Sequence, residues 1–172
     1  MCALSAACSP QYNWREVHGD TTGEKGAANA PFTVLLPARA DTFSQPVTLN
    51  GARVRMTMTA AEIDGVTFAV GAALFGDAAA AQNALPQMKE ALMKNIDGRP
   101  LATPVPGKPF AGADPARTLT LNAVGATRGK PLRMTGRLYN FDRKVYQVIV
   151  VGDPNKISEE AAETFLASFQ PG

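Results

Sequence analysis

Strict alternation of side chains marks residues 53–60 and limits what the chain can fold into. One face of such a strand carries Val54, Met56, Met58 and Ala60, and the other carries Arg53, Arg55, Thr57 and Thr59. A period of two is typical of a half-buried β-strand. Asn50-Gly51 before this segment and Asp64-Gly65 after it are tight-turn signals. Residues 47–75 therefore predict a meander of three antiparallel strands.

Further strands are predicted on both sides of the meander. A short apolar run between two prolines, 32–36, is typical of a strand. Residues 117–122, 132–139 and 145–152 predict three more, with a turn at 140–143. The last of these strands is apolar on nearly both faces, which favours a central position in the sheet.

Two helices are predicted by three- and four-residue spacing. Asp77 is a suitable cap for a helix over 78–96, whose apolar face carries Leu85, Met88, Leu92 and Ile96. Pro86 should kink this helix or begin a second one. Gly98 is the expected left-handed residue after its end. A closing helix is predicted to begin after Ser158, with Glu159 and Glu160 in its first turn and a buried stripe formed by Phe165, Leu166 and Phe169.

The order of these elements predicts an α+β fold, mainly an antiparallel sheet packed by two or more helices. The chain has 172 residues, of which 45% are hydrophobic, enough for one core. We expect a single globular domain over 31–172, preceded by residues 1–8 and a tether at 9–30. The tether is polar, but Trp14 lies in an alternating stretch at 12–17, so we expect this stretch to pack on the domain as an edge strand.

The first residues suggest where the protein resides. Leu4-Ser5-Ala6-Ala7-Cys8 resembles the bacterial lipobox, in which small residues precede the cysteine that receives a lipid. Residues 1–8 would then be a residual signal peptide and lipobox, with Cys8 as the lipid attachment site. The serine after Cys8 resembles the sorting pattern of outer-membrane lipoproteins, which predicts the periplasmic side of that membrane. The alternative is that Cys2 and Cys8 are ordinary thiols.

The carboxyl-terminal half resembles a known family. The matching segments are 136–139, 145–152, 159–160 and 165–169, together with the apolar run 32–37. They resemble PsbP-like domains, in order of elements over about residues 31–170. The resemblance implies an α/β/α sandwich and a protein that binds or assists other proteins. The family includes bacterial lipoproteins, and the whole chain is similar to small lipoproteins of Gram-negative bacteria.

Conventional catalytic designs find little support in the sequence. The one histidine, His18, lies in the polar tether, where we expect it to be exposed. Glu62 and Asp64 flank a turn, so a solvated turn explains them better than acid–base work. No phosphate loop, zinc spacing or calcium loop is present. We therefore expect no enzyme, no metal and no cofactor, with an unusual hydrolase as the remaining catalytic alternative.

Positive charge is concentrated in one part of the chain. Residues 98–150 carry a net charge of +7, whereas 1–97 carry −2 and 151–172 carry −3. The hypothesis is a basic docking face for an acidic envelope protein or an anionic polymer, formed by Arg53, Arg55, Arg133 and Arg137. The alternative is a solvated sheet face on which arginine maintains solubility. Nucleic acid is not an expected partner.

A proline-rich segment at 98–116 interrupts the pattern. A loop of this length is either functional or loosely ordered. Lys108 and Phe110 could cover a pocket or contact a partner, and a surface loop without a role is the alternative. Methionines at apolar positions, Met56, Met58, Met88, Met93 and Met134, would suit an adaptable pocket, although core packing is the commoner use.

Two function hypotheses follow. The first is a non-catalytic, lipid-anchored periplasmic module that binds an envelope partner or supports its assembly. The alternative is a lipoprotein that binds a small molecule or lipid in a pocket between the sheet and the helices. In both, the lipid anchor makes the membrane itself a partner.

Overall fold

Antiparallel strands build most of this α+β protein. The structure, a computed structural model, describes residues 11–19 and 29–172. The large sheet has seven strands in the order β3-β4-β5-β9-β8-β7-β6. In chain order their bounds are β3 Asp41–Leu49, β4 Ala52–Ile63, β5 Val66–Leu74, β6 Arg99–Pro100, β7 Thr118–Thr127, β8 Lys130–Phe141 and β9 Lys144–Gly152. The α+β prediction is thus confirmed.

A second, smaller sheet joins the two ends of the chain. Strand β2 (Phe32–Leu36) lies in its middle, between β1 (Arg15–Gly19) and β10 (Gln170–Pro171). The prediction of a strand at 32–36 is confirmed, but this strand does not join the large sheet. The predicted edge strand also forms, at Arg15–Gly19, and the Trp14 ring before it lies edge-on to Phe68 with centroids 6.4 Å apart.

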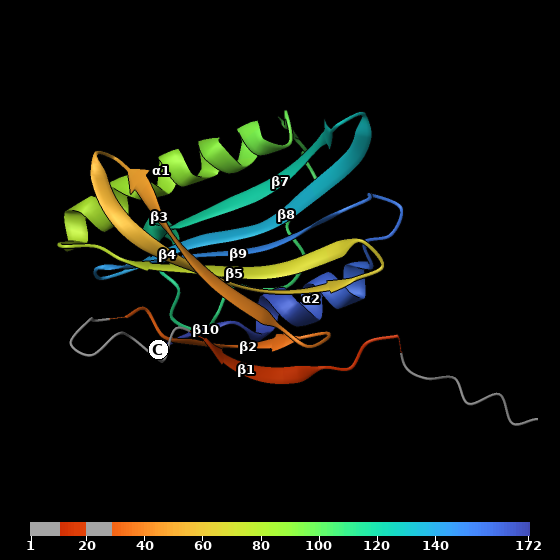
Figure 1. The fold of residues 1–172 in the computed structure, drawn as a ribbon, viewed down its shortest axis with the longest axis horizontal. Coiled ribbons are helices and arrows are strands. Elements are labelled where there is room, and N and C mark those ends of the chain that lie inside the picture. Colours follow the sequence, from red (N-terminus) through yellow and green to blue (C-terminus); the bar gives the residue numbers. More distant parts are fainter. Residues whose placement is uncertain (1–10, 20–28) are drawn as a thin grey trace, which may run out of the picture.

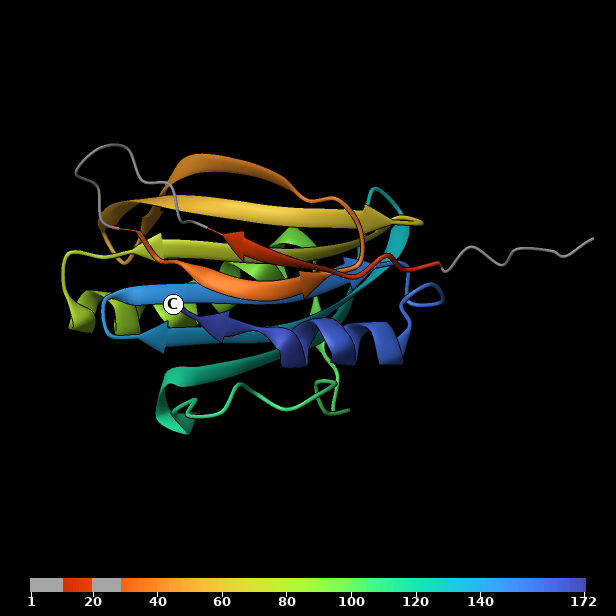
Figure 2. The same cartoon turned by 90° about the horizontal axis from the view of Figure 1, so that it is seen from below.

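The molecule has three layers (Figures 1 and 2). Helix α1 (Ala78–Asn95) covers one face of the large sheet, and helix α2 (Glu159–Ser168) together with the small sheet covers the other. Two apolar clusters fill the spaces between the layers. One outer layer therefore contains both a helix and a small sheet, whereas the resemblance implied helices in both outer layers. The resemblance to PsbP-like domains stays a prediction.

Local turn chemistry explains the meander. Asn50 and Gly51 have φ of 50° and 76°, and Asp64 and Gly65 have φ of 52° and 78°. Positive φ at both central residues is the requirement of a type I′ hairpin, so the two signals predicted both turns correctly. Strand β3 begins at Asp41, whereas the sequence predicted a start near Val47. The residues before Val47 are exposed and show no apolar alternation, so the pattern did not predict them.

Helix α1 departs from expectation at two points. It continues through Pro86 as one helix. Both Pro86 and Gln82, whose carbonyl loses its partner, are exposed, so water can satisfy that carbonyl. At the other end the left-handed residue is Asp97, with φ of 48°, and not Gly98. The Gly98 N–H donates to the Met93 carbonyl at 2.8 Å, which closes a Schellman motif.

Candidate functional site

The proposed arginine face does not form a single surface. Arg55 of β4 and Arg137 of β8 do share a face of the large sheet, but β5 and β9 lie between their strands. Arg137 is level with Thr59, four residues along β4 from Arg55. Three strand spacings, about 14 Å in total, therefore separate Arg55 from Arg137 across the sheet. A displacement of about 13 Å along the strand direction separates them further.

Arg137 is also unavailable to a partner, which corrects its assignment as a docking residue. Its side chain is buried, with 5% of the residue exposed. The guanidinium donates to the carbonyl oxygens of Val105 at 3.3 Å, Pro106 at 3.1 Å, and Gly107. Arg137 thus holds the proline-rich segment against the sheet.

Phe110 requires the same correction. It is 9% exposed and belongs to the cluster beneath α2, where its ring centroid lies 6.1 Å from that of Phe169. The segment at 98–116 is therefore ordered by its own aromatic anchor. Lys108 remains exposed beside it.

Arg133 pairs with an acid instead of facing solvent freely. Its side chain is 14% exposed, and its guanidinium forms an ion pair with Glu159 at the start of α2. Its Nε also donates to Asn122 Oδ1 at 3.4 Å. Of the proposed docking residues, Arg53, Arg55 and Lys108 are thus the exposed ones. Cys8, the proposed lipid site, lies outside the described residues.

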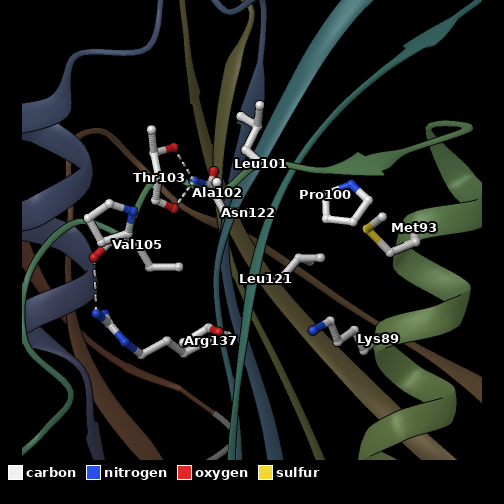
Figure 3. A pocket seen from close by; sticks show the side chains of 12 residues that line it. Lys89, Met93, Pro100, Leu101, Ala102, Thr103, Val105, Leu121, Asn122 and Arg137 are labelled. Atoms are coloured by element: carbon white, nitrogen blue, oxygen red, sulfur yellow. Dashed lines mark hydrogen bonds between the residues drawn. The ribbon is translucent and has the colours of Figure 1, made fainter.

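A cavity of about 460 Å³ opens between α1, β7 and the proline-rich segment (Figure 3). We call it the α1–β7 cavity. Its apolar wall consists of Met93, Pro100, Leu101, Ala102, Pro104, Val105 and Leu121. Its polar lining consists of Lys89, Thr103, Thr120, Asn122 and Arg137. The volume lies within the range of about 300–1,000 Å³ that is typical of small-molecule sites.

Strand β6 creates this cavity by ending early. It pairs with β7 only at Arg99–Val124 and Pro100–Ala123, and the last bond is from Leu101 N–H to the Asn122 carbonyl. Beyond that point the chain leaves the sheet edge. Because backbone groups alternate in direction along a strand, the N–H and C=O of Thr120 also point outward, into the space left open.

Residues 101–107 close the outer side of the cavity, and we call them the strap. Asn122 Nδ2 donates to both the backbone carbonyl and the hydroxyl of Thr103, each at 2.8 Å. Arg137 holds the other end of the strap through the three carbonyls. Figure 3 shows the bonds from Asn122 to Thr103 and, of the three from Arg137, the one to Val105. The cavity wall is thus fixed by side chains from two strands of the sheet.

The formally charged side chains that line the cavity, Lys89 and Arg137, are both positive. Lys89 projects from α1 toward Leu121 (Figure 3) and is half-buried. No Asp or Glu is among the described residues that line the cavity. Nearby, burial raises the pKa of the Tyr139 phenol, and this effect outweighs the Arg137 guanidinium, which lowers that pKa.

Other hollows differ in charge or size. On the far side of the strap, a hollow of about 490 Å³ contains the Arg133–Glu159 pair, so its cation is already neutralised. Another, of about 340 Å³, includes Asp114 and Asp142. A groove beside α1, lined by Met56, Met58 and Met88, measures about 170 Å³, below the usual range for a ligand.

The methionines that the sequence suggested for one adaptable pocket do not lie together in the structure. Met93 lines the α1–β7 cavity, three methionines line the small groove, and Met134 is packed in the core. Sequence reasoning missed Lys89, Thr120 and Asn122. No local signal distinguishes them, because the cavity depends on where β6 leaves the sheet.

The described residues contain no cluster of three His, Cys, Asp or Glu side chains that could hold a metal ion. His18 is exposed, as expected, with its Nε2 3.1 Å from Glu16 Oε1. Asp64 occupies a turn, where it accepts a hydrogen bond from Gln11 Nε2 at 3.1 Å. Among residues 11–19 and 29–172, no helix has the length and apolar character needed to cross a membrane.

The fold and the cavity define an α+β protein with a ligand-sized hollow at the junction of helix and sheet edge. Comparisons with protein-family models, with curated proteins and with solved structures find no match to this chain.

Proposed function

We propose that this chain is a non-catalytic binding protein, anchored by a lipid on the periplasmic side of the outer membrane, whose small-molecule ligand occupies the α1–β7 cavity. The observation that carries the proposal is the cavity itself, about 460 Å³ with a predominantly apolar wall. Its strap is held by hydrogen bonds from Arg137 and Asn122, so the protein's own side chains fix the wall of the site. Preformed, largely apolar hollows with a few polar groups are typical of ligand sites.

Methionine methyl groups provide a test that also locates the ligand. In a [¹³C-methyl]methionine sample, a ligand in the α1–β7 cavity should shift the Met93 signal saturably. A ligand in the small groove would instead shift Met56, Met58 and Met88. A panel of C8 compounds is a suitable first set, because the cavity wall is mainly apolar.

A filling variant provides the control for this experiment. Thr120 is exposed at the cavity, so Thr120→Phe should occupy the space and abolish the Met93 response. Thr48→Phe places the same side chain on an exposed position of β3 and should leave the response unchanged. No saturable Met93 shift with any C8 compound would refute the cavity as the binding site.

The membrane anchor requires a separate measurement. The protein should be expressed in a Gram-negative host with its native upstream sequence restored, and its intact mass measured. Cleavage before Cys8 with an added diacyl or triacyl group is the expected result, and Cys8→Ala should abolish it. An unmodified chain that retains Met1 would refute the anchor and would leave the cavity proposal in place.

A partner protein is the second candidate function, favoured by Phe43. This side chain is 55% exposed on β3, the first strand of the large sheet. The turn pairs Leu49 with Ala52, so alternate residues of β3 from Thr48 back to Thr42 point their backbone groups outward. Pro46 is one of these outward-facing residues, and it has no N–H to donate to an added strand. Residues 41–45 therefore remain the part of this edge that can pair with an added strand.

Photocrosslinking can test this edge in cells. A crosslinking side chain at position 43 should yield a discrete adduct, and the same group at the exposed Phe141 position should not. Ser44→Pro removes an outward N–H while sparing the pairing with β4, so it should abolish the adduct. Equal crosslinking at both positions would refute a specific role for this edge.

A further inference from the structure

We propose that the ligand of the α1–β7 cavity is an organic anion, with its charged group at Lys89 and its apolar body against Met93 and Pro104. The inference rests on the proposed function, because it requires that this cavity binds a ligand. It adds the chemical class of that ligand.

The cation at the cavity has no partner of opposite charge. Among the described residues, none forms an ion pair or a hydrogen bond with Lys89. Lys94, five residues along the same helix, is paired with Glu90 at 2.8 Å. The residues one turn away from Lys89 are Leu85, Pro86, Leu92 and Met93, which offer no carboxylate. Lys89 is therefore the unneutralised charge on this side of α1.

Arg137 adds a second positive charge that is buried. Its partners at the strap are carbonyl oxygens, which satisfy its N–H groups without carrying a formal negative charge. The effect of a charge is stronger in a partly desolvated site than in water. The formal charges around the cavity are therefore all positive, and an anion there would offset part of the cost of burying the Arg137 guanidinium.

Hydrogen-bond donors accompany the charge. The backbone N–H of Thr120 points outward from β7, and its exposed hydroxyl lies at the same edge. Lys89 has three donors on a flexible stem. An anionic oxygen between these groups would accept from both walls of the cavity.

The apolar wall limits the class of anion. Side chains of Met93 and Pro104 offer contact to carbon and no further donors. One flexible cation suits a single carboxylate better than a polyphosphate, which is bound by several cations or a phosphate-binding loop. A monocarboxylate with a hydrocarbon body is the compound class that matches both walls.

The hollow across the strap supports the choice by contrast. It is of similar size, about 490 Å³, and it shares Leu101, Thr103 and Pro104 with the α1–β7 cavity. Its Arg133 is paired with Glu159, so an incoming anion would find no uncompensated charge there.

Three probes of equal chain length separate charge from size: octanoate, 1-octanol and protonated octylamine. Binding is read from the Met93 methyl signal. We expect octanoate to bind about tenfold more tightly than 1-octanol, the factor supplied by one hydrogen bond to a charged group. Octylamine should bind most weakly. Added salt should weaken octanoate binding and leave 1-octanol binding unchanged.

Lys89→Gln should abolish the preference for octanoate over 1-octanol while the affinity for 1-octanol stays within about twofold. Lys94→Gln, on the exposed side of the same helix, should preserve the preference. If 1-octanol binds the unaltered protein as tightly as octanoate, the anion inference fails and the cavity function stands. If none of the three probes shifts Met93 saturably, both fail.

Discussion

The ring of Phe110, from the proline-rich segment, lies with its centroid 5.0 Å from that of Tyr139 on β8. Tyr139 in turn stacks on Phe169, with centroids 5.4 Å apart and planes at 8°. A loop, a strand and the end of α2 thus meet in one aromatic group. The loop contributes to the core as well as to the cavity.

Phe110→Ala should lower the free energy of unfolding by about 3 kcal/mol, because it removes a buried aromatic ring and leaves a void. Urea denaturation followed by circular dichroism measures this change. Phe43→Ala is the matched control, and its exposed ring should cost no more than about 0.5 kcal/mol. Equal effects of the two substitutions would contradict the anchoring role of Phe110.

Arg137→Met should loosen the strap, since the carbonyls of Val105, Pro106 and Gly107 lose their donors. The loss of hydrogen bonds from a buried charged group should cost about 2 kcal/mol. Hydrogen exchange in peptides covering the strap should become faster. Arg53→Met, at an exposed position on β4, should leave that exchange unchanged.

Tyr139 should make the protein less stable at alkaline pH. Burial raises the pKa of its phenol in the folded state, so ionisation is easier in the unfolded chain. The stabilisation by the neutral Tyr139 phenol is fully present below the phenol's pKa in the unfolded chain, about 10. It is lost as the pH rises through the phenol's pKa in the folded protein. Urea unfolding between pH 8 and 11 should show a shallower loss for Tyr139→Phe. Parallel curves would contradict this prediction.

Asp97→Gly should stabilise the protein by about 0.5 kcal/mol. Asp97 has a φ of 48° after the end of α1, a conformation that glycine adopts more readily. At the other end of the helix, Asp77 Oδ1 accepts the Ala80 N–H at 2.8 Å. Asp77→Gly should therefore be slightly destabilising, and thermal unfolding of the two variants should show opposite shifts.

Local patterns predicted the elements whose cause is local. The alternation at 53–60 and the Asn50-Gly51 turn predicted strand β4 and its hairpin with β3, although not the exposed first part of β3. Ser158 does cap α2, accepting the Ala161 N–H at 3.2 Å. These features depend on neighbours along the chain, so the sequence shows them directly.

Features that depend on distant neighbours were predicted less well. Arg133 and Arg137 do share a strand face, but Glu159 and the strap determine that neither faces a partner. The residues around Phe110 are typical of a surface loop, but Phe110 itself is buried. The α1–β7 cavity arises where β6 leaves the sheet edge at Pro100, which no periodicity reveals.

The placement of β2 between the first and last strands has a consequence for synthesis. Until α2 and β10 have been made, β2 lacks one of its neighbours, and the sheet face that carries Phe68, Tyr146, Val148 and Val150 lacks the cover of α2. A nascent chain therefore exposes apolar surface until α2 and β10 emerge, and exposed surface of this kind promotes aggregation. Burial of this face would be completed in one late step, when α2 and β10 dock.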